Sequence, residues 1–275
     1  MDSSGPLPGF LKRTDDFNLL SKGERGLVSV PVEMAGRRFK EQALNFNSDL
    51  VSHCVPLLDH AGPEASVWAS SQSLSACERV SFLTGRQPHV LTDDEWKRLC
   101  DNYESTARTL KAAGVGTAVL ALDDDGLLAS ALAKNALKQA YNNVGLLLQH
   151  LTPYFEALGV ALCVEDLSPG GRDAITGVRV AQEMVRAGAD FVVASSGSWA
   201  FPPLKHRART KARGDVEVAQ NEAWMASPAW LLGRIDVPVY ACGAVQSMEN
   251  ATEKASQLGF SGMVAWTPQN HVTHR

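Results

Sequence analysis

The sequence predicts an α/β barrel of parallel strands, each followed by a helix. Three observations favour it. The chain has 275 residues, a length typical of one such barrel. Short apolar segments alternate with longer amphipathic ones, as in repeated β-α units. No GxGxxG motif follows the first apolar segment, which disfavours a dinucleotide-binding Rossmann domain. Residues 1–9, rich in Pro, Gly and Ser, are predicted to be flexible, and residues 10–275 to form a single barrel domain.

Seven segments have the composition of strands that are buried on both faces of a parallel sheet. They are Leu27–Val32, Ala65–Ala69, Gly116–Leu122, Val160–Val164, Asp190–Ser195, Val237–Cys242 and Ser261–Trp266. The complete barrel of this class, the TIM or (β/α)8 barrel, has one strand more. Either Asn45–Leu58 contains a further strand, or the barrel is incomplete and has lost one unit.

The clearest helix is predicted between Thr92 and Ala113. Thr92 followed by Glu95 matches a capping box, in which a hydroxyl and a carboxylate bind free amides of the first turn. Apolar residues then recur at helical spacing as far as Leu110, and Gly114 ends the pattern. Further helices are predicted at about Asn143–Leu158, Asp173–Ala187 and Met248–Leu258, and each is followed by a predicted strand.

Composition and charge exclude several classes of protein. A net charge of -4 argues against a general nucleic-acid binder, which needs an excess of positive charge. No apolar run approaches the roughly 18–20 residues that span a bilayer, and residues 1–25 resemble neither a secretory signal nor a transit peptide. The 5 cysteines never stand in a CxxC spacing, which indicates reduced thiols. We therefore expect a cytoplasmic protein without a membrane span.

Chemistry is expected where the strands end, because active sites of α/β barrels form at that face. Carboxylates follow three of the predicted strands: Glu33, the run Asp123–Asp125, and Glu165 with Asp166. If these side chains converge, they could bind a divalent cation through oxygen ligands. They could instead raise one another's pKa and act as acid and base. The run Asp123–Asp125 could equally be a solvated loop that caps the next helix.

Two further segments could bind an anion. The basic stretch from Lys205 to Arg213 could clamp a phosphate or a carboxylate, although a solvated loop explains it equally well. Gly243 precedes a helix whose amino terminus could hold a phosphate, although a glycine at a strand end is also an ordinary tight turn. Trp199, Trp224 and Trp230, in the long loop after the fifth predicted strand, could wall a substrate pocket, or they could pack this loop against the barrel.

A series of short motifs between Leu91 and Trp266 carries a family resemblance. The motifs are Leu91–Glu95, Ala112–Gly114, Gly126–Leu128, Leu167–Pro169, Ala187–Asp190, Ser195–Gly197 and Val237–Val239 with Gly243. In this order and spacing the chain resembles the old yellow enzyme family, the FMN-dependent ene-reductases or NADH:flavin oxidoreductases. Before Leu91 the likeness is compressed, and Pro31 is its family-like residue there.

The resemblance implies a flavoprotein barrel that binds FMN and takes electrons from NAD(P)H to reduce a small-molecule substrate. It places the cofactor near Pro31, Ser168, Gly243 and Trp266.

The family's working residues are replaced in this chain. The substrate-anchoring pair falls on Leu122 and Asp125, the tyrosine proton donor on Leu127, and the flavin-facing arginine on Asp166. Leucine can neither hydrogen-bond a carbonyl nor donate a proton. An aspartate near the flavin opposes the negative charge of the reduced ring. The resemblance therefore implies the family barrel without standard ene-reductase activity.

Three functions stay open from the sequence, so whether the chain is an enzyme is undecided. The first is a flavin oxidoreductase with a rearranged site. The second is a non-redox lyase, isomerase or cyclase, in which Asp125, Asp166 and Glu33 form the catalytic set. The third is a pseudoenzyme that binds a protein partner, as an oligomer or as a subunit of a larger assembly, because an open barrel edge needs covering.

Overall fold

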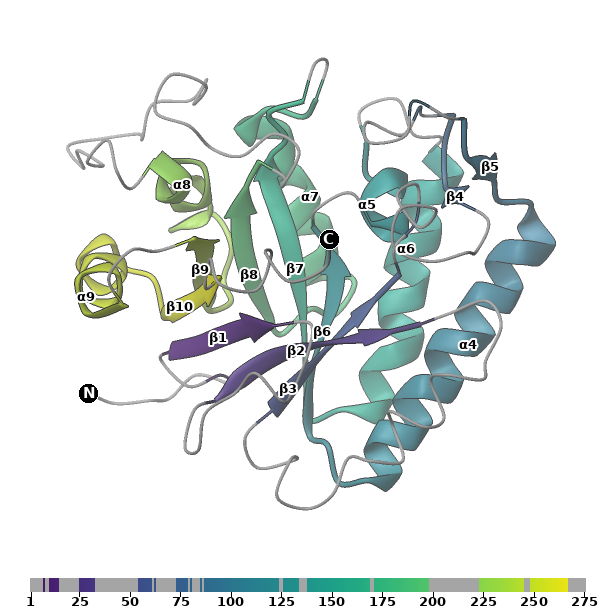
Figure 1. The fold of residues 1–275 in the computed structure, drawn as a ribbon, viewed down its shortest axis with the longest axis horizontal. Coiled ribbons are helices and arrows are strands. Elements are labelled where there is room, and N and C mark those ends of the chain that lie inside the picture. The colour runs from purple at the N-terminus through teal and green to yellow at the C-terminus, as the bar shows by residue number, and fades with distance from the viewer. Residues whose placement is uncertain are drawn as a thin grey trace, which may run out of the picture.

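A closed barrel of parallel strands is the centre of the fold (Figure 1). The computed structural model describes residues 7, 10–14, 25–32, 54–60, 62, 73–78, 80, 85, 87–123, 126–133, 138–168, 171–197, 223–244 and 248–266. Within them, the strands follow the order β1-β10-β9-β8-β7-β6-β3-β2 around the barrel. Their bounds are β1 Phe10–Thr14, β2 Gly26–Pro31, β3 Cys54–Asp59, β6 Thr117–Leu122, β7 Ala157–Glu165, β8 Phe191–Ser196, β9 Val239–Ala244 and β10 Gly262–Trp266. The predicted barrel class is confirmed.

Two of these strands are not among the seven predicted segments. β1 pairs with β10 on one side and with β2 on the other, and this pairing closes the barrel. β3 begins within Asn45–Leu58, the segment left open by the sequence, and pairs directly with β6 through Leu57 and Val119. The predicted strand Ala65–Ala69 lies outside the described residues.

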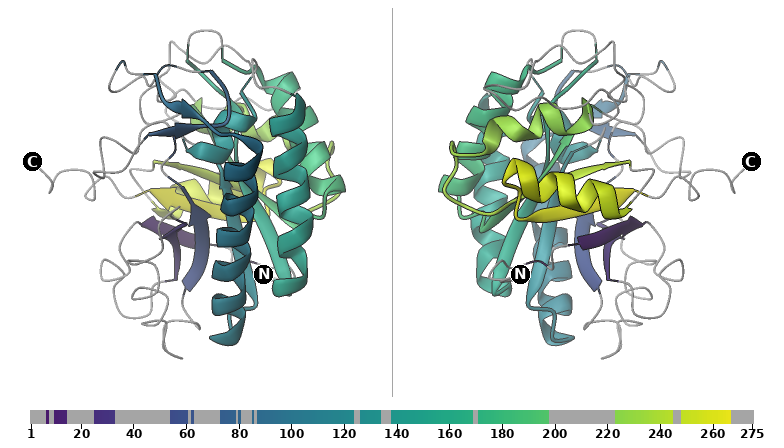
Figure 2. Two further views of the ribbon diagram at one scale, coloured as in Figure 1. Left: turned by 90° about the vertical axis from the view of Figure 1, so that its right-hand side faces the viewer. Right: turned by 90° about the vertical axis from the view of Figure 1, so that its left-hand side faces the viewer.

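Helices pack on the outside of the barrel. The described helices are α4 Asp93–Ala112, α5 Leu127–Ala131, α6 Lys138–Leu151, α7 Ala174–Arg186, α8 Ala223–Ala226 and α9 Met248–Leu258. α4 and α6 lie side by side on one flank, and α8 and α9 lie on the opposite flank (Figure 2). A small parallel sheet, β4 Leu74–Ser75 with β5 His89–Val90, packs beside α5. No helix in the described part of the chain is long and apolar enough to cross a membrane.

The predicted helix bounds agree with the structure except at α6, which begins at Lys138, before the predicted start at Asn143, and also ends early. The helix expected to reach Leu158 stops at Leu151 and is followed by a 3-10 turn, η3, over Thr152–Tyr154. Pro153 lies in this turn, and Phe155 is already extended. A proline lacks the backbone N–H that a continuing helix needs. The prediction was therefore too long, because β7 begins at Ala157.

Alternating strand residues divide the core into two layers, as the period of a β-strand requires. Residues of the inner set fill the barrel, among them Leu27, Val119, Phe191 and Tyr240. The other set packs under the helices. Phe191 and Tyr240 meet edge to face with ring centroids 5.9 Å apart. The Tyr240 hydroxyl accepts a hydrogen bond from the Leu7 N–H at 3.1 Å, so the chain before β1 is held at the amino ends of the strands. Leu7 is the one described residue of the segment predicted to be flexible.

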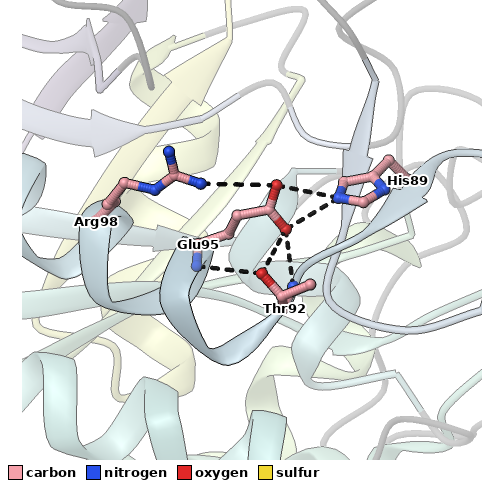
Figure 3. A network of polar contacts seen from close by, with 4 residues as sticks. All are labelled: His89, Thr92, Glu95 and Arg98. Atoms are coloured by element: carbon pink, nitrogen blue, oxygen red, sulfur yellow. Dashed lines mark hydrogen bonds and ion pairs between the residues drawn. The ribbon is translucent and has the colours of Figure 1, made fainter.

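The amino terminus of α4 has the predicted capping box (Figure 3). The Glu95 carboxylate accepts hydrogen bonds from the Thr92 N–H at 2.8 Å and from the Thr92 hydroxyl at 2.9 Å. His89 Nε2 of β5 lies 2.9 Å from the same carboxylate, and Arg98 Nη2 lies 3.9 Å from it. Hydrogen bonds from the Thr92 backbone, and then from His89, lower the pKa of Glu95 to about 2. The network joins β5 to the start of α4.

We expect Glu95→Ala to lower the free energy of unfolding by about 1 kcal/mol at pH 7, the usual value of a helix cap. Because the pKa of Glu95 is about 2 in the folded protein and 4.5 in the reference state, its contribution is present above pH 4.5 and is lost as the pH falls towards 2. Urea unfolding at pH 7 and pH 3 measures both effects. The control is Glu253→Ala on the exposed face of α9, and an equal effect of both substitutions would contradict the prediction.

Candidate functional site

Polar side chains gather where the barrel strands end, which is the face that carries the active site in α/β barrel enzymes. Asp59 ends β3 and His60 follows it, and Asp123 follows β6. Glu165 ends β7, and Ser196 ends β8. Below we call this face the mouth of the barrel.

Several predicted site residues lie outside the described part of the chain. These are Glu33, Asp125, Trp199 and the basic stretch 205–213. Pro31 and Trp266 are the last residues of β2 and β10, so their backbones reach the mouth. Among the described residues, no group of three or more His, Cys, Asp or Glu side chains is arranged to hold a metal ion.

Asp166 and Ser168 shape the loop between β7 and α7. The Asp166 carboxylate accepts a hydrogen bond from the Ser168 N–H at 2.9 Å, and the Asp166 N–H donates to the Arg172 carbonyl at 2.9 Å. The Gly171 N–H donates to the Ser168 carbonyl, also at 2.9 Å. The predicted catalytic residue Asp166 and the predicted cofactor residue Ser168 therefore both belong to a hydrogen-bonded turn.

A shift in strand register decides where Glu165 points. Cys163 pairs with Ser195, but Glu165 pairs with Ser196, because one extra residue of β7 lies between the two pairs. Paired residues of neighbouring strands share a face of the sheet. The shift therefore turns Glu165 from the face of Cys163 to the face of Ser196, as a β-bulge does.

On the face of Ser196, Glu165 is hydrogen-bonded to Ser227. Ser227 donates a hydrogen bond to Glu165 Oε2 at 2.5 Å, and Ser196 donates to the Ser227 hydroxyl at 3.4 Å. All three residues are buried. Ser227 precedes the 3-10 turn η5, Pro228–Leu231, so the contact fastens this turn to β7 and β8. Glu165 is thus engaged by Ser227 in a structural contact.

Arg172 is a buried cation that binds backbone oxygens. Its Nη1 donates to the Leu132 carbonyl at 2.7 Å, and its Nη2 donates to the Cys163 carbonyl at 2.5 Å. Leu132 caps the carboxyl end of α5, where unpaired carbonyls carry partial negative charge. Arg172 therefore ties β7 to α5, and these bonds leave Nε as its one unpartnered nitrogen within the described residues.

Leu122 and Leu127 are fully buried in the outer core, under the helices. The resemblance placed a substrate-anchoring residue at Leu122 and the proton donor at Leu127. Neither side chain belongs to the inner layer that fills the barrel.

Packing explains the glycine at position 243. A Cβ atom at Gly243 would lie 2.4 Å from the Trp224 side chain, so α8 can pack on β9 only if this residue is glycine. Trp224 is buried, and the Trp230 ring lies under the Arg234 guanidinium at 5.2 Å. For both tryptophans the packing alternative is supported.

His60 is a residue of the mouth that the sequence analysis did not single out. Its ring Nδ1 accepts a hydrogen bond from the Gly62 N–H at 3.0 Å. Burial lowers the pKa of His60 to about 4, so the imidazole is neutral at pH 7. A polar residue at a strand end is the signal that could have found it, and it was missed because β3 was not predicted.

Comparison with known proteins shows the fold. No family model matches the sequence, and no curated protein matches it. Solved structures do match: 2-naphthoyl-CoA reductase with 2-naphthoyl-CoA has a TM-score of 0.69 at 14% identity. An old yellow enzyme homologue from Zymomonas mobilis has a TM-score of 0.63 at 12% identity, and morphinone reductase with tetrahydroNAD 0.62 at 13%. The fold is that of old yellow enzyme homologues.

The three matches cover most of this chain but only part of each neighbour. The match to 2-naphthoyl-CoA reductase covers 89% of this chain, and each of the other two matches covers 88% of it. The matched part is 42% of 2-naphthoyl-CoA reductase, 75% of the Zymomonas mobilis protein and 74% of morphinone reductase. At identities of 12% to 14% the likeness establishes the barrel.

We expect Ser227→Ala to lower the free energy of unfolding by about 1–3 kcal/mol, because a buried carboxylate loses a hydrogen-bond donor. Ser196→Ala is the matched control and should cost less, since its bond to Ser227 is 3.4 Å long and joins two neutral groups. Urea unfolding measures both values. An equal cost for the two variants would contradict the assignment of Glu165 as the main partner of Ser227.

Proposed function

We propose that this protein is an old-yellow-enzyme-type barrel, derived from flavin oxidoreductases, that has lost standard ene-reductase activity. The barrel shared with morphinone reductase and the Zymomonas mobilis homologue supports the origin. The burial of Leu122 and Leu127 under the helices is the observation that supports the loss of ene-reductase activity. An ene-reductase must hold the substrate carbonyl and protonate the reduced carbon, and neither leucine can do so.

The described residues do not fit the family's way of holding FMN. A phosphate and a reduced flavin are both anionic and call for cations or free N–H groups. Asp166 occupies the arginine position, Arg172 is bound to carbonyls, and Trp224 fills the space beside Gly243. Ser195 offers a buried hydroxyl that has no partner in the described part of the chain. The described residues of the mouth therefore offer little to an anionic flavin.

The visible spectrum of the purified protein, recorded before and after incubation with excess FMN and gel filtration, tests this proposal. NADPH-dependent reduction of cyclohex-2-enone is measured on the same samples. We expect no enone reduction above the protein-free control. A retained band near roughly 450 nm, a property of the flavin, together with enone reduction would overturn the proposal. Retained flavin without turnover supports a redox enzyme with a rearranged site, and a colourless protein favours a non-redox one.

A non-redox enzyme is the second candidate, and the acidic mouth favours it. Asp59 ends β3, and Asp123 and Asp166 directly follow β6 and β7. Many such enzymes use pairs of carboxylates as acid and base. The third candidate, a scaffold, loses its main support. It rested on an open barrel edge, and β1 closes the barrel.

The role of Asp166 can be separated into charge and shape. Asp166→Asn keeps an oxygen that accepts the Ser168 N–H, so we expect its free energy of unfolding to stay within about 0.5 kcal/mol of the wild type. Asp166→Ala removes the acceptor and should cost about 1 kcal/mol. Thermal and urea unfolding give both values. If alanine proves as stable as asparagine, the turn does not need the carboxylate, and the catalytic interpretation of Asp166 gains support.

A further inference from the structure

Two thiols and a hydroxyl form a row inside the barrel, near its mouth. Cys163 of β7 pairs with Ser195 of β8. In β8 and β9, which are neighbours in the barrel (Figure 1), Ala194 pairs with Ala241. The next step in this register places Ser195 beside Cys242. Cys242 belongs to the inner layer, and paired residues share a face of the sheet. All three side chains therefore face the lumen, with the hydroxyl between the two thiols.

The spacing of the two thiols suits a bridging metal ion better than a disulfide. Neighbouring strands lie about 4.8 Å apart, so the Cα atoms of Cys163 and Cys242 are about 9.6 Å apart across β8. A disulfide needs Cα atoms within about 7 Å. An ion bound linearly to both sulfurs, with metal–sulfur bonds of about 2.3 Å, spans about 4.6 Å and leaves about 2.5 Å for each side chain. The two bonds from Cα to Sγ cover that distance.

Ser195 has a hydrogen-bond donor that the protein leaves unused. Its Oγ is buried and has no partner in the described part of the chain. A buried polar atom without a partner costs free energy, and such atoms are rare in proteins. Part of the residue is exposed, so a small ion can reach the row from the mouth. A thiolate on either side would accept the hydroxyl hydrogen and would supply the missing acceptor.

Arg172 places a positive charge beside the row. Its guanidinium donates to the carbonyl oxygens of Leu132 and Cys163, and no carboxylate pairs with it among the described residues. The bond to the Cys163 carbonyl is 2.5 Å long, so this buried cation lies next to a residue that carries one of the two thiols. A buried charge without an opposite charge is costly. A negative charge in the row would therefore be balanced by Arg172.

We propose that Cys163 and Cys242 bind one soft monovalent metal ion, Cu(I), as two thiolates above the hydroxyl of Ser195. Thiolates select soft ions. Zinc requires four ligands, whereas the described residues contain no group of three or more ligating side chains. Each thiol releases its proton to solvent as its sulfur binds the ion. The complex therefore carries a single negative charge, which the cation of Arg172 neutralises.

Binding exchanges one set of contacts for another. As a thiol, Cys163 donates to the carbonyl oxygens of Glu165 and Gly197 at 3.1 and 3.2 Å. As a thiolate it is repelled by both oxygens, and rotation about the Cα–Cβ bond turns the sulfur towards the lumen. This inference goes beyond the proposed function, because it requires neither flavin nor an organic substrate.

Anaerobic titration of the full chain with Cu(I), in competition with the chromogenic chelator bicinchoninate, measures stoichiometry and Kd. We expect one equivalent to bind. Cys163→Ser and Cys242→Ser should each raise the Kd about a hundredfold or more, because a hydroxyl is a poor ligand for a soft ion. Cys54→Ser is the matched control. Cys54 is as buried as Cys163, each 5% exposed, but it begins β3, so the Kd should stay unchanged.

A second pair of variants tests the hydroxyl. Ser195→Ala should raise the Kd for Cu(I) about tenfold, the usual effect of a lost hydrogen bond to a metal ligand. Ser196→Ala is the control, because the Ser196 side chain lies on the opposite face of β8 and is bonded to Ser227. Its Kd should equal that of the wild type.

The wild-type protein gives two further readouts. X-ray absorption at the copper edge should show two sulfur ligands, and oxidation with diamide should form no disulfide between Cys163 and Cys242. The inference is overturned if no equivalent of Cu(I) binds, if either cysteine substitution leaves the Kd unchanged, or if that disulfide forms. Where a variant does not fold, the two wild-type readouts decide. The flavin spectrum is recorded without copper, so the two proposals fail separately.

Discussion

Barrel closure by β1 is the constraint on which the other features of this structure depend. A parallel sheet has no short hairpins, and each strand must find neighbours on both sides or leave an edge exposed. β1 supplies the missing neighbour to both β10 and β2, with Phe10 opposite Met263 and Arg13 opposite Leu27. Once the ring is closed, its inner layer can be filled completely, and all strands end at one mouth.

Strand alternation within the closed ring then limits what the mouth can offer. Every second strand residue faces the lumen, and Leu122 is one of those directed to the helices. The register shift in β7 directs Glu165 to Ser227, which donates a hydrogen bond to its carboxylate. Arg172 donates a hydrogen bond to the Leu132 carbonyl at the end of α5. Most polar groups there are engaged by the protein itself. Among the described residues around the strand ends, the buried exceptions are the hydroxyl of Ser195 and Nε of Arg172.

The sequence predicted the elements whose signal is local. The capping box at Thr92 and Glu95 placed the start of α4, and continuous apolar runs identified β6 to β10. β1 and β3 were not predicted because their segments are not continuous apolar runs. β1 contains the charged residues Lys12 and Arg13, and β3 contains Pro56 and Asp59. Such segments become strands because they pair with neighbouring strands, and a local sequence pattern does not show this pairing. The helix that was predicted too long shows the same limit, since Pro153 ends it only in combination with the start of β7.

The candidate site was harder to predict, for a related reason. Asp166 and Ser168 were identified from their position after a strand, and both prove to hold a turn together. Position after a strand is thus necessary for a role at the mouth but does not show whether a side chain is available. Availability depends on bonds between units far apart in sequence, such as that of His60 to Leu127 or of Glu165 to Ser227.

The same separation explains how a barrel can keep its fold at 12% to 14% identity while its chemistry changes. The two packing layers demand apolar residues at alternating positions, and many sequences meet that demand. The mouth demands particular donors at particular atoms, and each replacement there changes the ligand. A leucine at position 127 adds to the outer core, whereas a tyrosine there would need a partner for its hydroxyl. Replacement of the family's polar residues by apolar ones is therefore compatible with a stable barrel, and the ligand must be sought among the donors that this chain has kept.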